Sequence, residues 1–162
     1  CARRSTPAYR SLGGNRDLYV TRAAAGAKGF GEAQKLGEGS WKLDKCPMDG
    51  GAIAGAADGG VFTVWRRRRK IYFGAPGQPE KELGGGEQPW IAAGPKGPHI
   101  VWTAARGGDL LYQAPGAAAA VKLAGGATDP VVASAPGGAA PVVAAWQAGE
   151  QVVTLVLVPA GK

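Results

Sequence analysis

Trp41 and two nearby carboxylates are the residues whose types and spacing most suggest ligand binding. Trp41 is followed by Asp44 and Asp49 in a segment that interrupts an otherwise repetitive sequence. A tryptophan ring can stack on the apolar face of a sugar, and aspartates can accept hydrogen bonds from its hydroxyl groups. The alternative is that the ring covers a seam between two structural units. The sequence leaves both interpretations open.

A second group is a basic run between two apolar segments, and its members are Arg66, Arg67, Arg68, Arg69 and Lys70. This position predicts a hairpin turn, where charges are solvated and protect a sheet edge from further pairing. We therefore expect replacement of the run by serine to leave folding intact. The functional alternative is contact with a polyanion, which the net charge of +7 also favours. No aromatic residue is interleaved, so base-specific nucleic-acid recognition is not expected.

The sequence gives no support to cofactor or metal chemistry. His99 is the only histidine, and Cys1 and Cys46 are the only cysteines. A structural zinc site needs about four ligands, and a catalytic histidine needs a titratable partner. No phosphate-binding loop, dinucleotide fingerprint or nucleophile elbow occurs in the sequence. We therefore expect no cofactor and no metal, and no strong disulfide between the two cysteines.

The elements that must position these residues form a repeat. Units around Trp65 and Trp102 match element for element: a short apolar run, a strand ending in tryptophan, a turn, a second strand, an Ala-Pro-Gly corner and a short final run. A third copy surrounds Trp146, and another begins near Tyr9. Four antiparallel strands repeated about every 40 residues is the period of a propeller blade. A β-sandwich also alternates strands and turns, but it does not require the same tryptophan and corner in each unit.

We therefore predict an all-β, propeller-like fold with about four four-stranded antiparallel blades in one domain, residues 1–162. The units are approximately 1–50, 51–87, 88–128 and 129–162. Because the first unit lacks an opening strand and the last lacks a fourth, the chain is either a small ring closed by residues 1–6 beside 152–157, or a fragment of a larger propeller. The recurring tryptophans are expected to pack in the core or between units.

The N-terminal part carries a more specific pattern. Tyr9-Arg10 and Arg16-Asp17 lie in two predicted strands, and Trp41 precedes Cys46 and Pro47 in a Trp-x-x-x-x-Cys-Pro loop. This pattern resembles a bacterial sialidase-like family of BNR-repeat, or Asp-box, β-propellers. Residues 24–30 keep only a glycine and an aromatic residue of the Asp-box, so the boxes are eroded. The resemblance implies a secreted, periplasmic or cell-surface protein.

The resemblance also implies a comparison with sialidase chemistry, which uses three arginines to hold a substrate carboxylate, a tyrosine nucleophile and an aspartic acid. Arg10, Arg16 and Arg22 lie in one unit, and the later units carry no matching arginines. The alternative is that Arg16 and Asp17 pair across a hairpin or with neighbouring backbone. A binding set is favoured over a catalytic one: Tyr9, Arg10, Arg16, Asp17, Trp41, Asp44 and Asp49.

The function expected from the sequence is a non-catalytic binding or assembly module of a secreted or cell-surface protein. Its propeller loops would meet a glycan or a protein partner, and the alternative is a sialidase-like glycoside hydrolase. No apolar stretch approaches the roughly 20 residues that span a bilayer, so no transmembrane segment is expected. Cys1 as the first residue is compatible with the lipid anchor of a mature bacterial lipoprotein, and also with a fragment that begins there.

Overall fold

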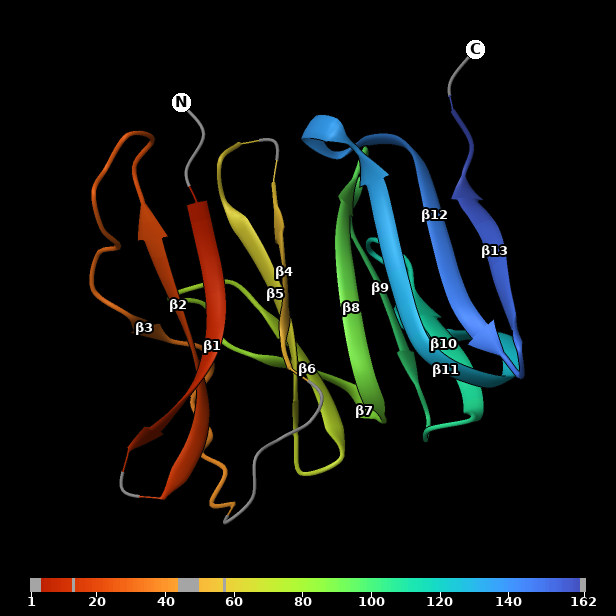
Figure 1. Ribbon diagram of the computed structural model, residues 1–162, viewed down its shortest axis with the longest axis horizontal. Helices are drawn as coiled ribbons and strands as arrows, with labels where there is room; N and C mark the ends of the chain where they lie inside the picture. Colours follow the sequence, from red (N-terminus) through yellow and green to blue (C-terminus); the bar gives the residue numbers. More distant parts are fainter. Residues whose placement is uncertain (1–3, 13, 44–49, 57, 161–162) are drawn as a thin grey trace.

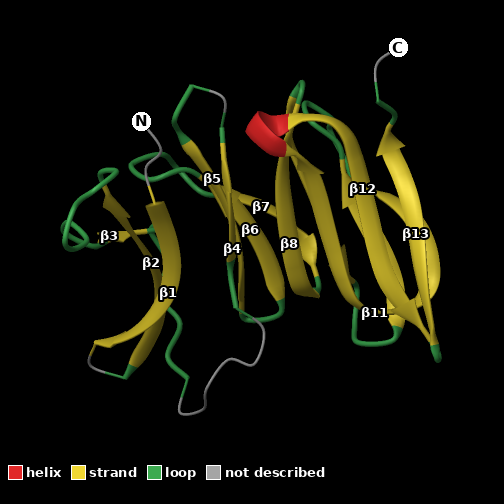
Figure 2. Ribbon diagram, turned by 45° about the horizontal axis from the view of Figure 1, so that its top comes forward, coloured by secondary structure: helices red, strands yellow, loops and turns green. Residues whose placement is uncertain are grey.

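The computed structural model describes residues 4–12, 14–43, 50–56 and 58–160, and for residues 4–12 only the backbone. Within these ranges it is built of β-strands and a single 3₁₀ turn, with no α-helix (Figures 1 and 2). The predicted all-β class is therefore confirmed. No helix of the described residues is long and apolar enough to cross a membrane.

The strands form three antiparallel sheets in chain order. The first contains β1 (Arg4–Leu12), β2 (Asn15–Ala23) and β3 (Gln34–Lys35). The second contains β4 (Ala52–Gly55), β5 (Val61–Arg67), β6 (Lys70–Gly74) and β7 (Lys81–Gly85). The third contains β8 (Glu87–Gly94), β9 (Gly97–Thr103), β10 (Gly108–Gln113), β11 (Val121–Ala135), β12 (Ala139–Ala148) and β13 (Gln151–Val158). The 3₁₀ turn η1 (Pro136–Gly138) joins β11 to β12.

Within each sheet, every strand pairs with the next along the chain, because short turns join antiparallel neighbours. The described strands thus group into sheets of three, four and six rather than four sheets of four. The difference lies in β11, which runs unbroken across the predicted boundary at residue 128. Its first part pairs with β10 and its second part, Ala127–Ala135, pairs with β12.

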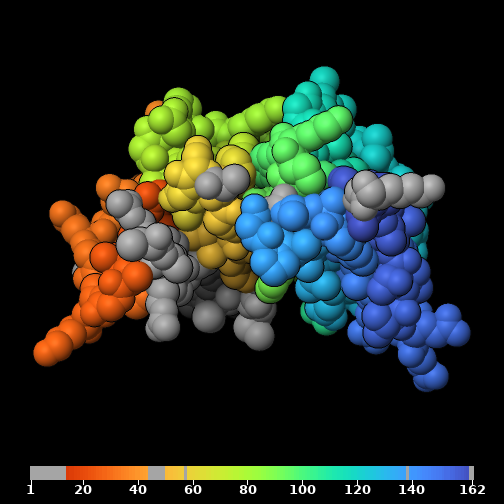
Figure 3. Space-filling view, turned by 90° about the horizontal axis from the view of Figure 1, so that it is seen from above, coloured from red at the N-terminus to blue at the C-terminus, as the bar shows by residue number. Residues whose placement is uncertain are grey.

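The expected ring closure by the N-terminal residues is wrong for Arg4 to Thr6. These residues pair with Thr21 to Ala23 of β2. β13 is an outer strand of the six-stranded sheet, and Val152 on it is 77 % exposed. Figure 3 shows the segment that contains β2 and β3 (orange) and the last strands (blue) at opposite ends of the molecule. β1 pairs with β2 because the two strands form a direct hairpin, and β1 is an outer strand of its sheet.

The core is a series of apolar clusters. One joins Leu18 and Val20 of the first sheet to Trp65 of the second. The next joins Val64 and Ile71 of the second sheet to residues of the third that include Trp102. The last lies within the third sheet and includes Trp146. The prediction that the recurring tryptophans are packing residues is confirmed, since all three are buried.

Candidate ligand-binding site

Trp90 is turned outward at the beginning of β8. Its side chain is 46 % exposed, whereas Pro89 and Ile91 on either side are buried. The pairing of β8 with β9 shifts between Glu87 and Trp90, and Gln88 has a φ of 54°. A non-glycine residue rarely adopts this left-handed conformation, and a β-bulge of this kind re-aims the neighbouring side chain. The irregular strand start therefore presents the indole ring.

The same irregularity recurs in β11. Its pairing with β12 shifts between Thr128 and Val131, and Asp129 has a φ of 50°. Gln88 and Asp129 are both followed by proline and occupy matching positions in two units. In the described chain, the other non-glycine residues with positive φ are the pair in the β5–β6 turn. Such backbone strain costs roughly 1–3 kcal/mol per residue and clusters at ligand sites.

Hydrogen bonds tie the two bulges together. Gln88 Nε2 donates to Asp129 Oδ1 at 2.5 Å, and the Asp129 backbone N–H donates to Gln88 Oε1 at 3.3 Å. Thr103 Oγ1 also donates to Gln88 Oε1 at 3.2 Å. Arg106 Nη2 lies 3.2 Å from Asp129 Oδ2. The polar groups beside Trp90 are therefore held in position before any ligand arrives.

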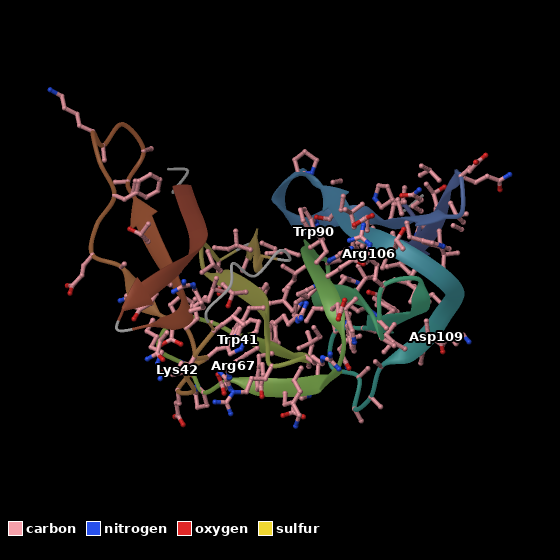
Figure 4. All side chains as sticks on the ribbon, turned by 60° about the horizontal axis from the view of Figure 1, so that its bottom comes forward. Trp41, Lys42, Arg67, Trp90, Arg106 and Asp109 are labelled. Atoms are coloured by element: carbon pink, nitrogen blue, oxygen red, sulfur yellow. The ribbon has the colours of Figure 1, made fainter. Side chains whose placement is uncertain are left out.

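These residues surround a pocket of about 340 Å³. Its wall combines Gly50 and Gly51, which precede β4, with residues 87–90 at the start of β8 and residues 129–131 within β11. Arg66 of β5 and Arg106 of the β9–β10 turn complete it. Figure 4 shows Trp90 and Arg106 close to one another beside β8 and β11. A pocket of this size with one aromatic face and a few fixed polar groups suits a small polar ligand.

A larger hollow of about 1050 Å³ lies at the other end of the same strands. It is lined by residues 53–56, 58–61, 91–93 and 132–137, together with Arg22. Most of these side chains are small and apolar, and few polar groups converge. The hollow and the Trp90 pocket thus lie at opposite ends of β4, β8 and the second part of β11.

Asp17 is engaged by its neighbours within the protein. Its Oδ1 accepts a hydrogen bond from the Trp41 backbone N–H at 3.0 Å, and its Oδ2 accepts one from Ser40 Oγ at 2.9 Å. Lys35 Nζ lies 3.1 Å from Oδ2. Burial of the carboxyl raises its pKa, but these hydrogen bonds and the charge of Lys35 outweigh burial, so the pKa of Asp17 is lowered. These contacts agree with one of the alternatives from the sequence, in which Asp17 pairs with nearby backbone.

Trp41 belongs to the same cluster. Its carbonyl accepts a hydrogen bond from the Arg16 backbone N–H at 2.7 Å, so the structure brings Arg16, Asp17 and Trp41 together. The Trp41 side chain is only 8 % exposed, and the Arg66 guanidinium carbon lies 5.9 Å from its ring centroid. Because Arg66 belongs to β5 and Asp17 to β2, the ring covers the joint between the first two sheets. The burial matches the seam interpretation and leaves little ring surface for stacking.

The remaining residues of the predicted set are less informative. Tyr9 and Arg10 pair through their backbones with Leu18 and Asp17, and their side chains lie outside the description. Asp44 and Asp49 lie outside the described residues, as do Cys1 and Cys46.

The basic run occupies the predicted hairpin. Arg68 and Arg69, with φ of 51° and 63°, form a two-residue turn between β5 and β6, as a type I′ hairpin requires. Both side chains are exposed, as expected. The expectation that all five charges of the run are solvated, however, is wrong. Arg67 makes two hydrogen bonds to the Glu80 carboxylate and lies 3.9 Å above the ring of Tyr72.

Two further members of the run are also paired. Arg66 is half-buried and lies 4.0 Å from Glu87. Lys70 is exposed and lies 2.8 Å from Glu82. Side chains near the end of a strand can pair with carboxylates of neighbouring strands. The local sequence does not indicate this pairing, because the partners come from other segments. Arg68 and Arg69 form the turn itself, and both side chains are exposed.

Sequence reasoning missed the Trp90 pocket. Trp90 lies in the short apolar run that opens the Trp102 unit, and the sequence predicts no role for it or for Glu87, Gln88, Arg106 and Asp129. One signal was present: extending the repeat upstream aligns Gln88-Pro89-Trp90 with Asp129-Pro130-Val131. That alignment marks Trp90 as a large aromatic residue where the next unit has valine.

Comparison with known proteins found no matching family model and no matching curated protein.

Proposed function

We propose that this protein is a non-catalytic binding module that holds a glycan in the pocket beside Trp90. The observation that carries the proposal is the exposed indole ring of Trp90 next to polar groups fixed by two strained bulges. One face of a sugar ring presents mainly C–H groups, which pack against an indole, while its hydroxyls need hydrogen-bonding partners. The pocket supplies both kinds of contact.

The pocket volume of about 340 Å³ agrees with this proposal. Small-ligand sites usually begin near 300 Å³, and a pocket at this lower limit accommodates one or two sugar rings better than a long peptide. Glu87, Asp129 and Gln88 offer acceptors, and Arg66 and Arg106 offer donors. Fixed donors and acceptors favour binding because less conformational freedom is lost when the ligand arrives.

A propeller-like scaffold is part of the proposal. It is supported by β4, β8 and the second part of β11, which open the second, third and fourth units; β8 contacts both β4 and β11. Strands of each unit then follow outward by short turns, and the core clusters join adjacent sheets. A relation to the sialidase-like BNR family, with a secreted or cell-surface location, extends this proposal and stands on the sequence pattern alone.

Direct binding measurements test the proposal. The protein is screened against immobilised glycans, and hits are titrated by calorimetry with the wild type, Trp90→Ala and Phe30→Ala. Phe30 is the matched control because it is an exposed aromatic residue, 52 % accessible, and does not line the pocket. We expect Trp90→Ala to weaken binding at least about tenfold and Phe30→Ala to leave it unchanged.

Two results would contradict the proposal. One is the absence of glycan binding by the folded wild type, and the other is equal affinity of the wild type and Trp90→Ala. Turnover of a fluorogenic sialoside above a boiled control would instead favour a glycoside hydrolase, which needs a carboxylate pair flanking the scissile bond. Near-ultraviolet circular dichroism of both variants checks that the fold is intact.

A further inference from the structure

The charged groups of the Trp90 pocket are balanced. The described residues of its wall include two cations, Arg66 and Arg106, and two carboxylates, Glu87 and Asp129. Arg106 Nη2 lies 3.2 Å from Asp129 Oδ2, and Arg66 Nη1 lies 4.0 Å from Glu87 Oε1. Each arginine therefore already faces a carboxylate, and the formal charge of these four residues is zero.

This balance bears on the charge of the ligand. An acidic sugar is held most strongly when an arginine can turn both N–H groups of its fork toward the ligand carboxylate. In this pocket, a ligand carboxylate would compete with Glu87 for Arg66 or with Asp129 for Arg106. The displaced protein carboxylate would then lie beside the negative charge of the ligand. Like charges at such separations oppose binding. An anionic ligand therefore gains little from the two arginines.

Uncharged hydroxyls meet no such conflict. A carboxylate has about four lone-pair sites and an arginine has five N–H donors, so each group keeps hydrogen-bonding capacity after pairing within the protein. Asp129 uses one site on each oxygen for Gln88 and Arg106. A sugar hydroxyl both donates and accepts, and it can bridge a carboxylate and a neighbouring guanidinium without separating them.

The net charge of +7 does not oppose this reasoning. Exposed cations such as Arg68 and Arg69 do not line the pocket. They attract polyanions over long range, but salt screens that attraction, and it does not depend on an aromatic ring. Salt dependence and dependence on Trp90 can therefore be measured separately.

From these contacts we infer that the Trp90 pocket selects an uncharged sugar residue over an acidic one. One face of the sugar packs on the Trp90 ring, and its hydroxyls bond to the Arg106–Asp129 and Arg66–Glu87 pairs. This inference rests on the proposed glycan binding and assigns its ligand class.

The test compares matched ligands. A neutral oligosaccharide identified in the glycan screen is titrated beside the same oligosaccharide carrying a terminal sialic acid or sulfate. Each is measured at about 0.1 M and about 1 M NaCl, which shortens the screening length from about 10 Å to about 3 Å. We expect the neutral form to bind at least about tenfold more tightly, with less than about a threefold change on adding salt.

Glu87→Gln provides a variant that shifts the preference. It removes one carboxylate and leaves Arg66 facing a neutral amide, so the pocket gains one positive charge. The acidic form should then gain affinity relative to the neutral form, by about threefold or more at low salt. Arg68→Ser is the matched control, because it changes the protein's charge outside the pocket and should leave the ratio unchanged.

The outcomes separate the two proposals. Tighter binding of the acidic form, lost in Trp90→Ala, would overturn the inference and leave glycan binding standing. Salt-sensitive binding of the acidic form alone, unaffected by Trp90→Ala, would overturn both, because the pocket would hold neither ligand. An unchanged preference in folded Glu87→Gln would also contradict the inference, since the charge balance would then not set the ligand class.

Discussion

Asp17 fixes the backbone of Trp41, 24 positions away, through a 3.0 Å hydrogen bond from the Trp41 N–H to its Oδ1. Asp17→Asn removes the negative charge that Lys35 and Ser40 also meet. We expect this variant to lose about 1–3 kcal/mol of unfolding free energy, measured by urea titration. Asp58→Asn is the control, because Asp58 is exposed and its contact with the Gly60 N–H can be kept by an amide oxygen. A change within about 0.5 kcal/mol is expected there.

The pH dependence of stability gives a second measurement of Asp17. Its pKa is lower in the folded protein than in the unfolded chain, because hydrogen bonds and Lys35 outweigh the opposing effect of burial. The resulting stabilisation is fully present above the unfolded value of about 4 and is lost as the pH falls through the folded pKa. Asp17→Asn should flatten this acid limb. An identical limb in the variant would show that another group is responsible.

His99 controls a separate pH range. Its side chain is 3 % exposed, and its Nδ1 lies 2.7 Å from the Tyr112 hydroxyl. Burial lowers the pKa of His99, so the unfolded chain takes up a proton first. Stability should therefore fall as the pH drops below about 6.5, by up to about 1.4 kcal/mol per pH unit, until the folded protein is protonated. His99→Leu should lack this slope; a variant that retains it would refute the assignment.

Arg67 is expected to be the structural member of the basic run. The hydrogen bonds that Arg67 donates to the Glu80 carboxylate raise the pKa of Arg67, and the pair is mostly shielded from water. Arg67→Ser should cost about 1–3 kcal/mol, whereas Arg68→Ser in the adjacent turn should stay within about 0.5 kcal/mol. Replacing the whole run by serine should therefore destabilise the protein, contrary to the expectation from sequence. Equal melting temperatures for the two single variants would argue against this role.

Gly86 is expected to tolerate no side chain. A Cβ there would lie 2.3 Å from Trp102 Cδ1 and 2.6 Å from the Thr103 carbonyl oxygen. Gly84, in the same segment, has nothing within 4 Å of such an atom. Gly86→Ala should destabilise the protein by about 1–3 kcal/mol more than Gly84→Ala, because a packed neighbour must move. Thermal unfolding followed by near-ultraviolet circular dichroism measures the difference, and equal losses would show that the packing yields easily.

Local patterns in the sequence predicted the strands, the β5–β6 hairpin and the buried positions of Trp65, Trp102 and Trp146. Alternating apolar residues and a short polar turn are sufficient for such features. The continuity of β11 was missed because a unit boundary was predicted at residue 128, whereas the strand runs from Val121 to Ala135 and passes through Gly126 at a φ of 67°. Glycine permits a turn but does not require one.

The Trp90 pocket could not be predicted from the same patterns. It depends on left-handed backbone at Gln88 and Asp129, and glutamine has little intrinsic tendency to adopt it. It also depends on a contact across 41 positions, between Gln88 Nε2 and Asp129 Oδ1. The contact of Asp17 with the Trp41 backbone could not be predicted for a related reason, since the two residues lie 24 positions apart.

Strand β11, which pairs with both β10 and β12, also affects how the protein unfolds. Because one continuous strand pairs with both β10 and β12, neither side can detach without disturbing the other. The six strands from β8 to β13 should therefore unfold as one cooperative unit. The first sheet shares no strand with its neighbours among the described residues and has only the two-residue β3 as its third member. Amide hydrogens of β2 should accordingly exchange with solvent sooner than those at the centre of β11, through partial unfolding that leaves the rest of the protein intact.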